Sequence, residues 1–201
     1  MHVIIDYGMG NLASVQRAFE KLDVNVKISN KEEDLRNAKS LILPGVGAFR
    51  DAIGLLNESG LSSVIKEEVS KGKNIIGICL GMQLLYEKGY EYGEYDGLGL
   101  IKGSIEYLDI ELKVPHMGWN NLKFNKQDPI LKYINEDEFV YFVHSYYAVS
   151  DNSEVLAYSE YGKKIPAIVR NENVYGIQFH PEKSGDVGLN ILRAYKEIME
   201  K

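Results

Sequence analysis

The chain has almost none of the cysteine that disulfides require, and it has no long apolar segment. Cys79 is the only cysteine among 201 residues, so an internal disulfide is excluded, and a reducing compartment is expected. No apolar run approaches the roughly 18 residues that cross a membrane. The first residues also lack the basic region and the apolar stretch of a signal peptide. We therefore expect a cytoplasmic protein without membrane association.

Positive charge is also in deficit. The chain carries 23 Lys and Arg against 29 Asp and Glu, a formal net charge of −6, whereas nucleic-acid binding needs a basic face. No pair of histidines or carboxylates has metal-ligand spacing, and no nucleotide fingerprint or phosphate loop is present. We therefore expect no nucleic-acid partner, no metal and no cofactor. The length predicts a single domain, which we assign to residues 1–201.

Strands and helices alternate in the first half of the chain. Apolar residues at helical spacing between Leu12 and Leu22 predict a helix that Asn11 can cap. Repeated strand–helix units imply a parallel sheet with helices on both faces. Strands are predicted at 2–6, 24–29, 40–43 and 74–78, and further helices at 31–38, 49–57, 61–71 and 82–87.

The second half follows a different pattern. Residues 87–99, rich in Tyr, Glu and Gly, predict an exposed loop to which we assign no chemistry. The apolar face of Val187–Met199 predicts a final helix. The predicted fold class is therefore α/β, a flavodoxin-like, open and mostly parallel sheet with antiparallel strands appended in the second half. Those strands are expected within 98–125, 138–149, 154–160, 165–171 and 173–179.

The single cysteine lies in a motif typical of a nucleophile. The segment Gly77-Ile78-Cys79-Leu80-Gly81 has the spacing of a nucleophile elbow, in which a strand turns sharply into a helix. The flanking glycines remove side chains that would clash at such a turn. A helix N-terminus also favours a thiolate over a thiol. A lone cysteine is more often a small buried apolar residue, but the two glycines favour a nucleophile.

A cysteine nucleophile needs a base, and the base needs a residue that orients it. His180 ends an alternating apolar segment, and Glu182 follows two residues later, close enough to fold back onto the imidazole. A polar strand end followed by a turn explains the same residues equally well when they are considered alone. Together with the elbow, they favour a Cys79–His180–Glu182 triad.

An oxyanion formed at this site would need N–H donors. The backbone N–H of Leu80, directly after the nucleophile, is one candidate. The second is expected from Val46 or Gly47, where glycine frees the backbone. A tight strand-to-helix turn is the alternative explanation for these glycines. Because all these segments follow predicted strands, they converge on one edge of one sheet.

Several motifs now carry a family resemblance. The segments Gly77–Gln83 and Phe179–Glu182 resemble the class I (triad) glutamine amidotransferases. Four further segments resemble those family members that supply ammonia to a cyclase subunit in histidine biosynthesis. They are Asp6-Tyr7-Gly8-Met9-Gly10-Asn11-Leu12, Pro44-Gly45-Val46-Gly47-Ala48-Phe49, Pro115-His116-Met117-Gly118-Trp119-Asn120 and Tyr141-Phe142-Val143-His144-Ser145-Tyr146.

The resemblance implies how glutamine is held. Gln83 and the backbone of Gly47, Ser145 and Tyr146 would bind the substrate. The residues themselves support only part of this, because Gln83 lies one helical turn from Cys79 and hence on the same helix face.

The resemblance also implies a partner, a cyclase with a (β/α)8 barrel that forms a heterodimer with this chain. Trp119, Tyr141 and Lys183 would lie at or near that contact. Tryptophan is enriched at interface centres, so we favour an interface role for Trp119 over a place in the core. A solvated surface lysine is the alternative for Lys183. The three histidines outside the triad, His2, His116 and His144, are interpreted as structural.

Three other functions remain open at this point. The first is a glutaminase that serves another ammonia-using synthase, against which the segments 6–12 and 115–120 argue. The second is a thiol hydrolase or peptidase on the same fold, which would cleave peptides rather than glutamine. The third is a binding module without activity, in which Cys79 would not react with a glutamine-like electrophile.

Overall fold

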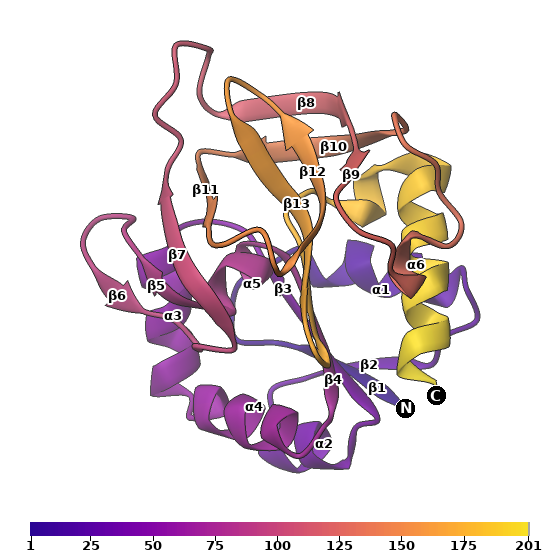
Figure 1. Cartoon of the computed structure of the whole chain (residues 1–201). Coiled ribbons are helices and arrows are strands. Elements are labelled where there is room, and N and C mark those ends of the chain that lie inside the picture. The colour runs from indigo at the N-terminus through magenta and orange to yellow at the C-terminus, as the bar shows by residue number, and fades with distance from the viewer. Residues whose placement is uncertain (201) are drawn as a thin grey trace.

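Parallel strands form the centre of the main sheet. In the computed structural model, which describes residues 1–200, their order is β2 (Val26–Ser29), β1 (His2–Ile5), β3 (Ser40–Gly45), β4 (Asn74–Cys79) and β14 (Val174–Ile177) (Figure 1). The sheet continues beyond β14 with antiparallel strands. The predicted mostly parallel sheet with appended antiparallel strands is confirmed. The antiparallel strands are β13 (Lys164–Asn171), β12 (Val155–Glu160) and β9 (Lys123–Phe124).

Helices cover both faces of this sheet, as predicted. One core contains the apolar side chains of α2 (Glu32–Asn37), α3 (Phe49–Glu58) and α4 (Leu61–Ser70), which lie together in the lower part of Figure 1. The other core contains those of α1 (Leu12–Glu20) and the C-terminal α6 (Gly185–Met199). Strands β1, β3 and β4 are buried on both sides, which explains their nearly continuous apolar sequences.

In Figure 1, one smaller sheet lies above the carboxyl ends of the parallel strands, and a second lies to their left. β8 (His116–Asn121) pairs with β10 (Phe139–His144) in an antiparallel ribbon, and Trp119 lies opposite Tyr141. The second sheet has the order β11-β7-β5-β6. Its strands are β11 (Tyr146–Val149), β7 (Ile101–Tyr107), β5 (Tyr86–Gly89) and β6 (Tyr95–Asp96), and the 3-10 helices are η1 (Pro129–Leu131) and η2 (Pro181–Lys183).

Three local predictions were wrong. The helix expected at 82–87 is the shorter α5 (Leu80–Leu84), and Tyr86 already belongs to β5. The loop expected at 87–99 contains the end of β5 and all of β6, because these short strands pair with each other and with β7. Asn11 does precede α1, but its side chain makes no capping hydrogen bond. The sequence near residues 86–96 does not reveal β5 and β6, because the pairing of β5 with β7 depends on residues further along the chain.

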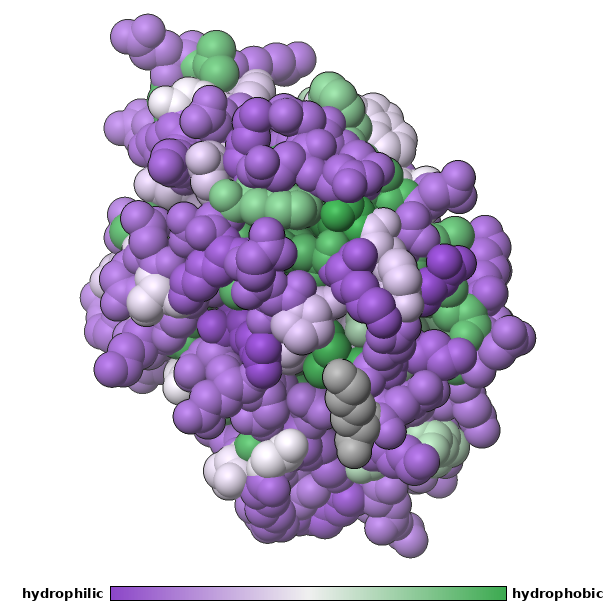
Figure 2. Space-filling model, turned by 45° about the vertical axis from the view of Figure 1, so that its right-hand side comes forward, coloured by the Kyte–Doolittle hydropathy of each residue, from purple (hydrophilic) through white to green (hydrophobic). Residues whose placement is uncertain are grey.

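The surface turned forward in Figure 2 is mostly hydrophilic, and the apolar side chains visible on it gather in a hollow below its upper part. Among residues 1–200, no helix has both the length and the apolar content needed to cross a membrane.

Candidate active site

Cys79 lies at a strained turn between β4 and α5. Its backbone adopts φ 55° and ψ −112°, a conformation that residues other than glycine rarely adopt. The turn brings Gly81 against β3, where an added Cβ would lie 1.8 Å from the Leu43 carbonyl oxygen. A Cβ on Gly77 would lie 2.5 Å from the carbonyl oxygen of Gly81. Both glycines are therefore required by the turn, which is the elbow geometry that the motif predicts.

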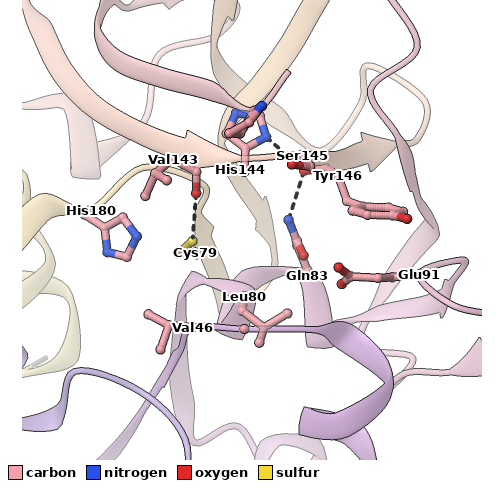
Figure 3. A pocket seen from close by; sticks show the side chains of 12 residues that line it. Val46, Cys79, Leu80, Gln83, Glu91, Val143, His144, Ser145, Tyr146 and His180 are labelled. Carbon is pink, nitrogen blue, oxygen red and sulfur yellow. Dashed lines mark hydrogen bonds between the residues drawn. The ribbon is translucent and has the colours of Figure 1, made fainter. Parts of the chain in front are cut away.

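His180 and Glu182 lie just beyond the neighbouring strand. β14 pairs in parallel with β4, with Ile177 opposite Ile78, so the residues that follow both strands emerge at one edge of the sheet. The Nδ1 atom of His180 lies 2.8 Å from Glu182 Oε1, and both side chains are almost completely buried. Figure 3 shows the imidazole of His180 beside the sulfur of Cys79.

The surroundings of His180 favour its charged form. Burial lowers the pKa of the imidazole, but hydrogen bonding and charge interactions with Cys79 and Glu182 outweigh burial and raise that pKa to about 10. The Cys79 Sγ lies 3.9 Å from the Val143 carbonyl oxygen, on the pocket side of the imidazole. The three side chains can therefore act as nucleophile, general base and orienting carboxylate.

A pocket of about 310 Å³ opens at this edge of the sheet (Figure 3). Its walls include most of the residues predicted for the site, whereas Glu182 lies behind His180, outside the pocket. Trp119, Tyr141 and Lys183 do not line it. The predicted residues that do are Val46, Gly47, Cys79, Leu80, Gln83, Ser145, Tyr146 and His180.

The comparisons with known proteins agree with this geometry. The family model described as "Glutamine amidotransferase class-I" matches residues 3–194. The chain belongs to the class-I glutamine amidotransferases. A relative from Oceanobacillus iheyensis, named "Imidazole glycerol phosphate synthase subunit HisH", is 51% identical over 201 residues, covering 99% of this chain and 100% of that protein. A Lactococcus lactis protein of the same name is 51% identical over 196 residues, covering 97% of each chain.

Solved structures share the fold of this glutamine amidotransferase at much lower identity. A structure described as "Crystal structure of glutamine amidotransferase" superposes with a TM-score of 0.78 and 23% identity, covering 99% of both chains. "Structure of PurLQS from Thermotoga maritima" gives a TM-score of 0.76 with 20% identity, covering 98% of this chain and 97% of that chain. These similarities support the α/β fold described above.

Sequence reasoning missed an acidic residue in the pocket. Glu91 lies in the segment predicted to be a loop without chemistry, yet its carboxylate lines the pocket across Gln83 from Cys79 (Figure 3). Its Oε2 accepts a hydrogen bond of 2.7 Å from the N–H of Phe49, at the start of α3. Burial raises the pKa of Glu91. In this amidotransferase the carboxylate is thus fixed where a ligand cation could meet it.

The amide side chains near the sulfur form a second feature that the motifs did not reveal. The Nε2 of Gln83 donates to the Tyr146 carbonyl oxygen at 3.0 Å and to Gln178 Oε1 at 3.1 Å. Gln178, which is fully buried, presents its own Nε2 4.0 Å from Cys79 Sγ. The alternation of residues 175–179 places Gln178 on the face opposite Tyr175, Ile177 and Phe179, and nothing in the sequence indicates that this face is buried as well.

The predicted interface residues lie outside the pocket, on or next to the β8–β10 ribbon. Trp119 has 56% of its surface exposed and meets Tyr141 edge-on, with ring centroids 6.0 Å apart. Met117 and Phe139 are similarly exposed on the same ribbon. The alternative of a core position for Trp119 is therefore wrong. Lys183, at the end of η2, is exposed.

Proposed function

We propose that this glutamine amidotransferase is the glutaminase subunit of an imidazole glycerol phosphate synthase. It would act in the cytoplasm as one domain spanning residues 1–201. The observation that carries the proposal is the pairing of the Cys79 elbow with the buried His180–Glu182 pair at one pocket. The name shared by relatives that are 51% identical over nearly the whole chain supports the specific assignment.

The reaction is hydrolysis of the glutamine side-chain amide. The Cys79 thiolate attacks the amide carbon and forms a tetrahedral intermediate. The His180 imidazolium gives its proton to the departing nitrogen, so ammonia leaves and a thioester remains. Neutral His180 then takes a proton from water, whose oxygen attacks the thioester, and glutamate and the Cys79 sulfur are released. Glu182 orients His180 and stabilises its positive charge throughout.

The oxyanion of each tetrahedral intermediate needs donors at the pocket wall. The N–H of Leu80, the first residue of α5, is one proposed donor, since the first N–H groups of a helix lack partners within it. The backbone N–H of Val46 or Gly47 is the second proposed donor, in a loop where Gly47 has a left-handed φ of 101°. The hydroxyl of Tyr7 donates to the Pro44 carbonyl oxygen at 2.9 Å and supports the start of this loop. One such donor typically contributes about 3 kcal/mol to transition-state stabilisation.

The rest of the pocket suits the backbone end of a glutamine molecule. Glu91 offers a carboxylate to the α-ammonium group, at the end of the pocket away from Cys79. Gln83 and the backbone of Gly47, Ser145 and Tyr146 bind the remaining polar groups. A peptide substrate has no free ammonium at this position, which favours free glutamine over peptide hydrolysis.

The ammonia is used on a second polypeptide. We propose a cyclase subunit with a (β/α)8 barrel, which forms a heterodimer with this chain and converts its ribonucleotide substrate to imidazole glycerol phosphate and an aminoimidazole carboxamide ribotide. The exposed aromatic side chains of the β8–β10 ribbon support a contact there through Trp119 and Tyr141, with Lys183 at its margin.

The test is glutamate production by the purified chain, alone and with the cyclase subunit plus its ribonucleotide. We expect little activity from the chain alone and a rise of at least about 100-fold in the complex, because one oxyanion donor contributes a rate effect of about that size. Cys79→Ala should remove the activity in both states. Full glutaminase activity of the isolated chain would contradict activation by the partner. Absence of glutamine hydrolysis in every state, or hydrolysis of peptides instead, would overturn the proposed function.

Trp119→Ala tests the contact. We expect weaker activation by the cyclase, because truncation removes a large exposed aromatic side chain from the ribbon, while alkylation of Cys79 by iodoacetamide in the isolated chain stays unchanged. Leu55→Ala, which truncates an exposed apolar residue on α3, is the matched control and should activate normally. Equal activation of both variants would place the interface elsewhere.

A further inference from the structure

Two buried histidines connect the β8–β10 ribbon to the pocket. His144 ends β10 and lines the pocket, and His116 lies opposite it at the start of β8. The Nδ1 of His144 lies 2.9 Å from the Tyr146 carbonyl oxygen, and its Nε2 lies 3.0 Å from His116 Nδ1. The Nε2 of His116 lies 3.3 Å from the side-chain amide nitrogen of Asn120. These contacts form one continuous chain from β8 to the substrate pocket.

The direction of each hydrogen bond between Asn120 and Tyr146 is set by the carbonyl group of Tyr146 at the pocket end. A carbonyl oxygen only accepts, so His144 must donate from Nδ1 to Tyr146. Neutral His144 then accepts at Nε2, and His116 must donate to it from its own Nδ1. The Nε2 of His116 in turn accepts from the Asn120 amide, whose Nδ2 also donates to the Glu160 carbonyl oxygen at 3.1 Å. Only one pair of tautomers satisfies all of these bonds.

Burial keeps both rings in this state. Desolvation lowers the pKa of His116 to about 4, and it lowers the pKa of His144 to about 3 against the opposing effect of its bond to Tyr146. The His116 ring is also held in place by stacking between Phe142, at 4.6 Å between centroids, and Tyr161, at 4.1 Å. Both histidines in this hydrogen-bond chain are thus neutral and fixed in position at physiological pH.

At the pocket end of the hydrogen-bond chain, the Tyr146 carbonyl determines where the Gln83 amide points. The Tyr146 carbonyl oxygen accepts from His144 and also from Gln83 Nε2, at 3.0 Å. Gln83 continues to Gln178, whose amide faces the Cys79 sulfur. An oxygen with two donors is held in direction as well as position, because each donor occupies one lone pair.

We propose that His116 and His144 are positioning residues that fix the Tyr146 carbonyl, and through it the Gln83 amide, in the geometry that binds glutamine. This inference rests on the proposed glutaminase function. Neither histidine touches the reacting atoms, so their loss should weaken glutamine binding more than it slows the chemical step.

Paired substitutions at residue 144 separate this role from a purely structural one. His144→Leu removes the donor to Tyr146, whereas the amide nitrogen of His144→Asn can replace Nδ1–H as that donor. In the complex with the cyclase, we expect His144→Leu to raise the KM for glutamine at least about 5-fold with kcat changed less than 3-fold. His144→Asn should recover most of that loss in KM. His2→Leu, which removes a buried histidine bonded to Ser40 in another part of the sheet, should leave both constants unchanged.

A second readout does not depend on the proposed function. In the isolated chain, nitrogen NMR should show His116 and His144 as neutral Nδ1–H tautomers at pH 7, and the Gln83 side-chain amide should exchange faster with solvent in His144→Leu than in His144→Asn. Another tautomer, or equal Gln83 exchange in the two variants, would overturn the positioning role even if the leucine variant folds poorly. Equal KM values for the two variants would also overturn it. If the wild-type complex hydrolyses no glutamine while the NMR results hold, the proposed function fails and the positioning of Gln83 stands.

Discussion

The strain at Cys79 predicts an unusual reversal in stability. At most positions glycine is less stable than alanine by about 0.5–1 kcal/mol, because glycine loses more backbone freedom on folding. At φ 55° and ψ −112°, however, a residue with a Cβ carries strain of order 1–3 kcal/mol that glycine does not. Subtracting the ordinary cost of glycine from this strain leaves about 0–2.5 kcal/mol in favour of glycine, with a central value of about 1 kcal/mol. Cys79→Gly should therefore be more stable than Cys79→Ala by that amount.

Urea unfolding of the two variants measures this difference directly. Both lack the sulfur, so lost contacts of the thiol cancel in the comparison, and the slope against urea should be equal. In a protein of this length, each kcal/mol also corresponds to roughly 2–4 °C in Tm. Ala52→Gly, a buried substitution within α3, is the control and should show the ordinary loss of stability. An alanine variant that is equal to or more stable than the glycine variant would refute strain at the elbow.

Three further predictions follow from the site and its surroundings. Gly81→Ala should destabilise the fold by more than about 3 kcal/mol in urea unfolding, because its Cβ would overlap the Leu43 carbonyl oxygen at 1.8 Å and the backbone must move. Glu182→Gln should lower kcat more than it changes the KM for glutamine, because a neutral amide cannot stabilise the His180 cation; an unchanged kcat would remove Glu182 from the triad. Burial lowers the pKa of His116 to about 4 in the folded protein, whereas the pKa in the unfolded protein is about 6.5. Between these two pH values, His116 therefore binds a proton in the unfolded protein but not in the folded protein. The free energy of unfolding should thus fall as pH drops from 6.5 toward 4, and His116→Asn should reduce that slope; an equal slope would show that His116 does not contribute.

The elbow and the parallel sheet could be predicted because their determinants are local. Gly77 is required by a close backbone contact with Gly81, four residues along the same turn, and the helix at Leu12–Glu20 shows its apolar face directly in the sequence. The same reasoning placed His180 and Glu182 together, since they are only two residues apart. Such features need no knowledge of the rest of the chain.

The remaining parts of the site depend on contacts between distant segments. Glu91 enters the pocket because its carboxylate binds the N–H of Phe49, 42 residues earlier, and nothing near residue 91 indicates that partner. His116 and His144 pair across an antiparallel ribbon, although they are 28 residues apart in the sequence. Their separate sequence contexts predict buried histidines, but only the register of the two strands reveals a connected chain.

The position of β14 has a consequence for synthesis of the protein on the ribosome. Strand β4, with its apolar residues, pairs on one side with β3 and on the other with β14, which is made almost 100 residues later. Until Val174–Ile177 has emerged, one edge of β4 has no native neighbour and could pair with other nascent chains. His180 and Glu182 follow β14 closely, so the step that covers this edge also brings the proposed base to the thiol. A nascent chain that ends before β14 would therefore be prone to aggregate and unable to release ammonia.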